Sequence, residues 1–187
     1  QGYADALEIA TITANLLQCA PENILVASTG VIGKPLDMNL IRPALEELVA
    51  GMTPDGSHDA QEAIMTTDTI PKEIAVELHL QGERVVIGGI AKGSGMIHPN
   101  MATMIGVITT DCNISRKLLD KALKDVVNRT FNRVTIDGDT SVCDMVVLLA
   151  NGMADNPGIT SEGEDFDQFK KGLEYVCTHL SRLIAKD

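Results

Sequence analysis

The stretch from Gly88 to Asp111 holds the residues best suited to chemistry, and Ala102-Thr103 is its most specific pair. A small residue precedes a threonine that follows a Gly-rich polar loop and begins an apolar segment. This arrangement suits an N-terminal nucleophile: the hydroxyl attacks the preceding carbonyl carbon, the peptide becomes an ester, and water releases a new N-terminal threonine. The freed α-amine, with an ordinary pKa of about 7.7–8.0, can then help to activate the hydroxyl. Ala-Thr pairs are also common at the starts of ordinary strands, so the pair alone leaves both interpretations open.

Two other side chains in this stretch, Lys92 and His98, could bind or catalyse. Lys92 and the two residues after it are similar to the end of a phosphate-binding loop. Ala91 stands where that motif needs glycine, however, so the sequence does not predict a nucleotide site. We expect His98, a lone histidine in a polar loop, to be a solvated surface residue.

The four cysteines are widely scattered and show no metal-ligand spacing, so we expect neither a metal nor a cofactor. Their apolar surroundings predict reduced, buried thiols and a cytoplasmic protein. These residues are Cys19, Cys112, Cys143 and Cys177.

Composition restricts the partners. The 187 residues are 44% hydrophobic and 22% charged, which is typical of a globular protein, and the length predicts one domain or two small halves that share a sheet. The net charge of −11 without a basic cluster argues against nucleic acid and anionic membranes. No apolar run approaches the roughly 20 residues of a membrane span.

Helices and paired strands must position these residues. Apolar periodicity predicts helices over 3–17, from a cap at Asp37 to Gly51, from a cap at Ser115 to 127, and from 164 to the end. Short apolar or alternating segments predict strands at 24–27, 72–80, 84–90, 104–108, 134–136 and 145–150, with a polar loop at 52–59. Strands 72–80 and 84–90 form an expected hairpin, so the predicted class is α+β.

Four ordered motifs resemble the ornithine acetyltransferase family, the bifunctional glutamate N-acetyltransferases of arginine biosynthesis. The strongest runs from Lys92-Gly-Ser-Gly-Met-Ile through Pro99-Asn-Met-Ala-Thr103 to Ile108-Thr-Thr-Asp111. The others are Ser28-Thr-Gly-Val-Ile-Gly33, Thr66-Thr-Asp68, and Val134-Thr-Ile-Asp-Gly-Asp-Thr-Ser141 continuing to Leu148-Leu-Ala-Asn-Gly152. The resemblance covers the chain and implies the layered helix and sheet sandwich of that family, which is similar to N-terminal-nucleophile folds.

The resemblance also implies roles for individual residues. Thr103 is the expected nucleophile, and the Ala102–Thr103 bond the expected self-cleavage site. Thr29 and Gly30 match the pair that supplies the oxyanion hole. Thr66, Lys92 and Thr103 match substrate-binding positions.

Two departures from the family pattern matter. Cys143 stands before Asp144 where the family usually has asparagine. The family also continues past Asp187 with an Asp-Gly-Glu-Gly segment whose glutamate lines the site. We therefore expect residues 1–187 to be one incomplete domain of a longer protein, with 1–102 ending its α-chain and 103–187 starting its β-chain.

The implied reaction is acetyl transfer from N-acetylornithine to glutamate through an acetyl-threonine, and some members also accept acetyl-CoA. The implied assembly is a heterotetramer of two α and two β chains in the cytoplasm. Two alternatives from other classes remain: an aminopeptidase with the same kind of nucleophile, and a non-catalytic binding or assembly module.

Overall fold

The computed structural model describes residues 2–29, 33–94, 104–136, 141 and 143–187. The chain forms two compact units, Gln1–Gly56 and Ser57–Asp187, each with its own packing. Within the described ranges, no helix combines the length and the apolar character that crossing a membrane requires.

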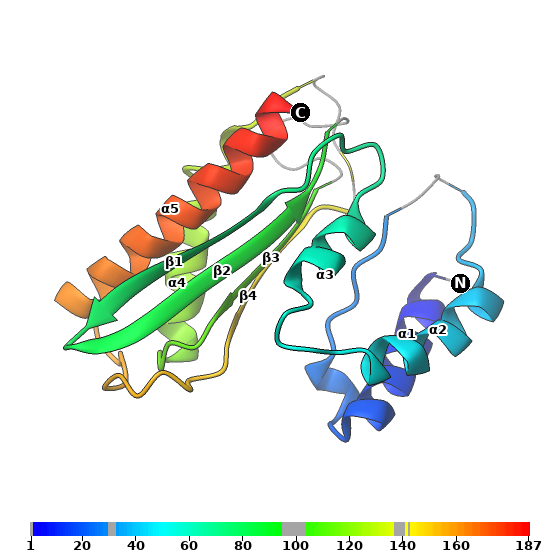
Figure 1. Ribbon diagram of the computed structural model, residues 1–187, viewed down its shortest axis with the longest axis horizontal. Coiled ribbons are helices and arrows are strands. Elements are labelled where there is room, and N and C mark those ends of the chain that lie inside the picture. The colour runs from blue at the N-terminus through cyan, green and yellow to red at the C-terminus, as the bar shows by residue number, and fades with distance from the viewer. Residues whose placement is uncertain (1, 30–32, 95–103, 137–140, 142) are drawn as a thin grey trace. The chain divides into compact units, whose positions relative to one another are not determined.

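Two helices make up most of the first unit. Helix α1 (Gly2–Leu17) packs against α2 (Met38–Ala50), and the short 3₁₀ helix η1 (Pro21–Asn23) follows α1 in the chain (Figure 1). Asp37 caps α2 as predicted, because its side chain accepts a hydrogen bond from the Asn39 backbone N–H at 3.1 Å. The Arg42 guanidinium donates to both Glu8 oxygens, at 2.5 and 3.2 Å, and so joins the two helices.

The strand predicted at 24–27 is wrong. These residues have no regular secondary structure, and the Leu25 side chain is 62% exposed. A strand needs a neighbouring strand to pair its backbone groups, and the described part of the first unit contains helices but no strand. An apolar run of four residues therefore does not suffice to make a strand.

A four-stranded mixed sheet forms the centre of the second unit, with strand order β1-β2-β3-β4. The β1–β2 and β2–β3 pairs are antiparallel and the β3–β4 pair is parallel. A two-residue turn, Gln81-Gly82, joins β1 to β2 with φ angles of 52° and 91°, which matches the positive φ angles of tight hairpin turns. The strands are β1 (Glu73–Leu80), β2 (Glu83–Lys92), β3 (Ile105–Thr110) and β4 (Met145–Ala150).

Helices α4 (Arg116–Val127) and α5 (Glu164–Lys186) pack on the sheet (Figure 1). Helix α5 contacts β1 and β2 along the hairpin. The Gln81 amide in the hairpin turn bonds the Asp165 carboxylate in the first turn of α5, while Asp187 after α5 contacts Lys72 before β1. A helix of 23 residues is about 34 Å long, which is enough to follow the whole hairpin.

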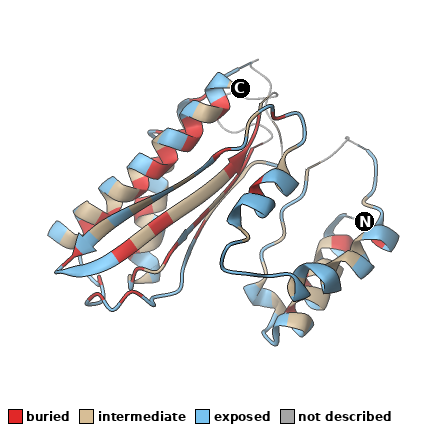
Figure 2. Ribbon diagram, in the orientation of Figure 1, coloured by how far each residue is buried: buried red, intermediate tan, exposed pale blue. Residues whose placement is uncertain are grey.

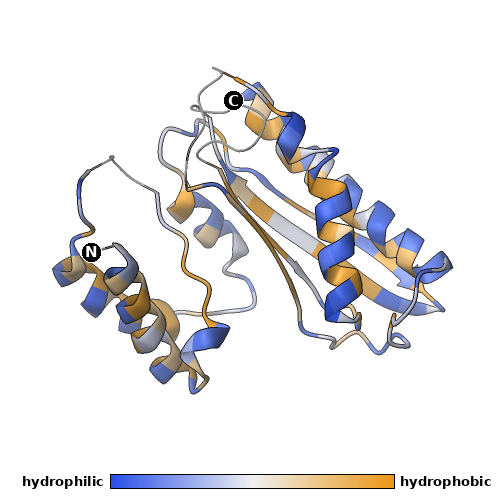
Figure 3. Ribbon diagram, turned by 180° about the vertical axis from the view of Figure 1, so that it is seen from behind, coloured by the Kyte–Doolittle hydropathy of each residue, from blue (hydrophilic) through white to orange (hydrophobic). Residues whose placement is uncertain are grey.

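The core lies between the sheet and these helices. Figure 2 shows buried residues along the inner side of α5, and Figure 3 shows hydrophilic residues on its outer side. Near the end of this helix, Leu183 is only partly buried, whereas Ile184 beside it is fully buried. The fully buried or nearly buried members on α5 are Phe166, Phe169, Leu173, Val176, Leu180 and Ile184. The predicted α+β class is confirmed.

Three further expectations for the second unit and the thiols need correction. Residues 134–136 form no strand but follow a 3₁₀ helix, η2 (Phe131–Arg133), whose Phe131 is buried. The predicted polar loop ends early, because helix α3 (Ser57–Ile64) begins within it. Cys112 and Cys177 are buried as predicted, but Cys19 and Cys143 are exposed because they lie in surface connections.

Candidate functional site

Lys92 and Thr66, both predicted to bind substrate, meet in the second unit. Lys92 is the last residue of β2, and Thr66 lies in the connection between α3 and β1. The Lys92 ammonium donates a hydrogen bond to the Thr66 hydroxyl at 2.8 Å, although 26 residues separate them. Lys92 is only 3% exposed, so its charge lies in a largely desolvated position.

The hairpin register explains this meeting. Because β1 pairs antiparallel with β2, the end of β2 lies beside the start of β1, where Glu73 pairs with Ile90. The Ala91 N–H donates to the Lys72 carbonyl at 2.9 Å and extends the pairing by one step. The chain that enters β1 from α3 therefore passes directly beside the residues that leave β2.

Two more contacts join residues 66–68 to residues 92–94. The Gly93 N–H donates to Asp68 Oδ1 at 2.6 Å, and the hydroxyls of Thr67 and Ser94 are 2.7 Å apart. Asp68 Oδ2 also accepts the backbone N–H of Thr66 at 3.2 Å. The two segments are thus held together at three successive positions.

A buried ion group supports this junction. The Lys72 ammonium is fully buried and donates to Asp68 Oδ1 at 2.8 Å and to Asp187 Oδ2 at 2.5 Å. Asp187 also accepts the backbone N–H and the hydroxyl of Thr69. Both carboxylate side chains are fully shielded from solvent. Buried charges of this kind are stable only when they are paired and hydrogen-bonded, as each of them is here.

The protonation of Asp68 follows from these contacts. Burial acts to raise the pKa of its carboxyl group, but the Lys72 ammonium and the N–H groups of Gly93 and Thr66 together outweigh burial. The pKa of Asp68 therefore lies below its ordinary value, and the group is a carboxylate at neutral pH. Asp68 ends the Thr66-Thr-Asp68 motif, but the family resemblance implied no role for Asp68 or for Lys72, and their other local signal is the four-residue spacing of opposite charges.

The residue after the predicted nucleophile is also fixed. The Met104 N–H donates to Asp144 Oδ1 at 2.7 Å, and the Met104 carbonyl accepts the Met145 N–H at 2.9 Å. Burial raises the pKa of the Asp144 carboxyl, and the bond from Met104 offsets this only in part. The unusual Cys143 is exposed, and its N–H donates to the Ser141 hydroxyl at 3.1 Å.

Other predicted site residues are placed only in part. Thr29 is half-buried in the irregular segment of the first unit. Gly30, His98, Ala102 and Thr103 lie outside the described residues. The oxyanion hole, the nucleophile and the cleavage site thus stay predictions.

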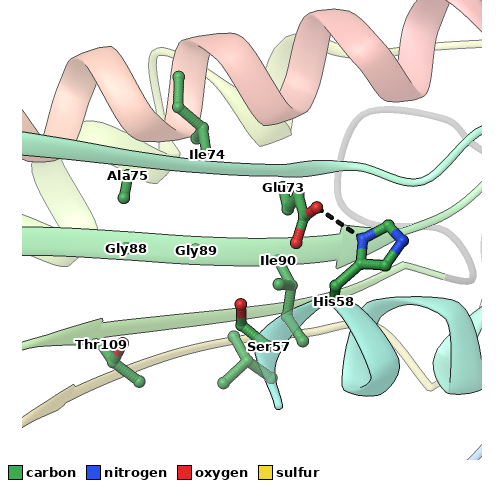
Figure 4. Close-up of a pocket in the computed structure, with 10 residues that line it drawn as sticks. Ser57, His58, Glu73, Ile74, Ala75, Gly88, Gly89, Ile90 and Thr109 are labelled. Atoms are coloured by element: carbon green, nitrogen blue, oxygen red, sulfur yellow. Dashed lines mark hydrogen bonds and ion pairs between the residues drawn. The ribbon is translucent and has the colours of Figure 1, made fainter. Parts of the chain in front are cut away.

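A separate pocket of about 510 Å³ lies on the sheet near the start of α3 (Figure 4). His58 Nδ1 lies 2.8 Å from Glu73 Oε1, and this bond raises the pKa of the His58 imidazole. Neither Lys92 nor Thr66 lines the pocket, and its His58 side chain is 54% exposed. We assign it no chemistry. Among the described residues, no group of three or more His, Cys, Asp or Glu side chains could hold a metal ion.

The comparisons with known proteins agree on one family. The chain matches the ArgJ family over residues 1–187. The arginine biosynthesis bifunctional protein ArgJ of Symbiobacterium thermophilum is 49% identical over 187 residues, which are 100% of this chain and 46% of that protein. The protein of the same name from Bacillus subtilis (strain 168) is also 49% identical, with the same shares covered.

The chain thus spans about half the length of these relatives. The crystal structure of the arginine biosynthesis bifunctional protein argJ from Bacillus halodurans aligns with a TM-score of 0.48 and 35% identity, over 56% of this chain and 53% of that one. Because the family match extends over every residue, the chain belongs to the ArgJ family, as its four sequence motifs predict.

Proposed function

We propose that this chain is part of an enzyme of arginine biosynthesis that transfers an acetyl group from N-acetylornithine to glutamate. Family membership supports the pathway, since the relatives are named arginine biosynthesis bifunctional proteins. The observation that carries the proposal is the Lys92–Thr66 pair, in which a buried ammonium is bonded to a hydroxyl at 2.8 Å.

Lys92 has the surroundings of an anion-binding group. In the described structure its ammonium is hydrogen-bonded to the neutral hydroxyl of Thr66, whereas the nearby Lys72 already holds two carboxylates. Both proposed substrates carry an α-carboxylate, which a protein of net charge −11 repels at long range. A local, poorly solvated cation would offset that repulsion and hold the carboxylate through a charge-assisted hydrogen bond.

The proposed chemistry begins with maturation. The Thr103 hydroxyl oxygen attacks the Ala102 carbonyl carbon, and the C–N bond breaks to free the α-amine of Thr103. Water then hydrolyses the resulting ester, which leaves a carboxylate on Ala102 and restores the Thr103 hydroxyl. Asp144 holds the N–H of Met104, the next residue, and so limits the movement of the backbone on that side.

In turnover, the Thr103 hydroxyl attacks the acetyl carbon of N-acetylornithine while the α-amine accepts its proton. Thr29 and Gly30 would stabilise the oxyanion, and ornithine leaves with the proton on its amine. The glutamate amine then attacks the acetyl-threonine, and N-acetylglutamate leaves as the hydroxyl is restored. This ping-pong cycle needs no metal or cofactor.

The partners form part of the proposal. The α and β chains of one precursor would assemble as a heterotetramer in the cytoplasm, and acetyl-CoA is a second candidate acetyl donor. The pairing of β2 with β3 supports continued association of the two chains after cleavage. Strand β2 lies before the proposed cleavage site and β3 lies after it, so the backbone hydrogen bonds between them would join the α chain to the β chain.

Intact-mass measurement of the full-length protein tests the proposal. We expect two chains, the second beginning at Thr103, and a mass increase of one acetyl group on that chain with excess N-acetylornithine. Thr103→Ala should give one uncut, inactive chain, while the control Thr109→Ala, at an exposed position on β3, should be processed normally.

Other outcomes separate the alternatives. Normal processing of Thr103→Ala would refute the nucleophile. A processed protein that hydrolyses peptides but does not transfer acetyl groups would indicate an aminopeptidase. An unprocessed protein that never becomes acetylated would indicate a binding or assembly module.

A further inference from the structure

One carboxylate connects the backbones of the two substrate-binding positions. Asp68 accepts the N–H of Thr66 on Oδ2 and the N–H of Gly93, the residue after Lys92, on Oδ1. Its side chain is fully shielded from solvent. The backbone at Thr66 and the backbone next to Lys92 are therefore held at a separation that the two oxygens of one rigid group define.

The backbone conformation at Gly93 makes its hydrogen bond to Asp68 important for the position of Lys92. Gly93 has a φ of 152°, which residues with a side chain rarely adopt, so the position directly after Lys92 favours glycine. The bond of 2.6 Å from the Gly93 N–H to Asp68 holds the backbone in this conformation. Without it, the backbone next to Lys92 would lose its bond to the Asp68 carboxylate, and the Lys92–Thr66 bond would lose part of its support.

Lys72 keeps Asp68 in its charged form and in place. Its ammonium lies between Asp68 and Asp187, so the three groups carry a net charge of −1. The junction thus contains two buried lysines with different surroundings: Lys72 is matched by two carboxylates, and Lys92 is bonded to a hydroxyl. The Asp68 oxygens accept hydrogen bonds from Lys72 and from two backbone N–H groups, whereas the Lys92 ammonium is bonded to Thr66.

We propose that Asp68 is a positioning residue that sets the distance between Thr66 and Lys92 and thereby the affinity for the substrate carboxylate. The inference rests on the proposed function, because it assigns Asp68 to the same binding site. Asp68 acts through Thr66 and Lys92 and is not a catalytic residue.

The test compares Asp68→Asn and Asp68→Glu with the parent, as full-length, processed enzymes. Asp68→Asn keeps the shape but replaces one acceptor by a donor, which cannot pair with an N–H group. It leaves Lys72 and Asp187 as a matched ion pair, so we expect the variant to fold. Asp68→Glu keeps the charge but shifts both oxygens by one methylene, and it carries the comparison if Asp68→Asn does not fold.

A positioning role predicts that KM for both N-acetylornithine and glutamate rises about tenfold or more in each variant. Loss of a charge-assisted hydrogen bond between Lys92 and the substrate carboxylate would weaken binding by about 10–150-fold. Calorimetric titration with glutamate should show the same rise in Kd, and this measurement does not depend on turnover.

The control is Asp111→Asn. Asp111 Oδ1 accepts a hydrogen bond from the Val86 N–H at 2.8 Å. Val86 lies on β2, as Lys92 does, but six residues and about 20 Å before it. We expect this variant to keep the parental KM and Kd.

Different outcomes would overturn the inference. If Asp68 acted by charge alone, Asp68→Asn would bind carboxylates more tightly, because an anion near Lys92 is removed. If its role were structural only, both variants would melt at lower temperature with parental KM and Kd. A folded variant that fails to self-cleave would place Asp68 in maturation. If the parent transfers no acetyl group but binds glutamate, and both Asp68 variants weaken that binding, the proposed reaction fails while the positioning role stands.

Discussion

Replacing Lys92 by methionine should lower kcat/KM for both substrates by a similar factor. Methionine keeps most of the aliphatic stem of this side chain, which is 3% exposed, and removes only the ammonium. A hydrogen bond to a charged group contributes about 1.5–3 kcal/mol. At 1.4 kcal/mol per factor of ten, kcat/KM should fall by about 10–150-fold for N-acetylornithine and for glutamate.

The fold should tolerate this change. The described structure pairs Lys92 with the hydroxyl of Thr66, an exposed residue that water can hydrate once the ammonium is absent. No carboxylate among the described residues loses its counter-charge, because Asp68 and Asp187 are paired with Lys72. Lys92→Met therefore removes a buried charge without leaving a buried partner unmatched, and self-cleavage should persist.

The assay is steady-state kinetics of both half-reactions on the processed, full-length enzyme. Lys117→Met, at an exposed position in α4, makes the same chemical change away from the site and should leave kcat/KM unchanged. Thr66→Val combined with Lys92→Met should cost less than the sum of the single changes, because the two side chains share one hydrogen bond. Parental kcat/KM for both substrates would show that Lys92 binds no substrate. Loss of processing would place its role in maturation instead.

Two further predictions concern other parts of the chain. Thr29→Ala in the full-length enzyme should lower kcat by about 10²–10³ while the fold persists, since it removes one oxyanion donor; turnover within a few-fold of the parent would make Thr29 structural. Burial raises the pKa of the Cys112 and Cys177 thiols to about 12, so iodoacetamide at neutral pH should spare both and label Cys19 and Cys143 first, as peptide mass mapping would show. Equal labelling rates for buried and exposed thiols would contradict this.

The regular elements show where local pattern was sufficient. Helix α5 was predicted because its apolar residues recur at helical spacing over 23 residues, and the hairpin because alternation flanks Gln81-Gly82. Such patterns depend on neighbours within a few residues. Asp37 was recognisable as a cap for the same reason, since it bonds a backbone group two residues away.

The wrong secondary-structure predictions lie in segments whose structure depends on residues far away in the sequence. Apolar runs at 24–27 and 134–136 have strand composition, but a strand exists only beside another strand. Helix α3 begins at Ser57 within residues rich in turn formers, and its Gln61 is fully buried against the rest of the unit. Short helices of this kind depend on packing more than on propensity.

The sequence alone determined the family and the residue types available for chemistry, because ordered motifs such as Thr66-Thr-Asp68 and the stretch after Lys92 are local strings. Only the tertiary structure showed that Asp68 joins Thr66 to Gly93 and that Lys72 meets Asp187 across 115 residues. These contacts depend on the hairpin register and on the length of α5, which bring the ends of β1, β2 and α5 together. Local periodicity specifies which face of each element is buried, whereas the meeting of distant ends depends on the packing of the whole unit.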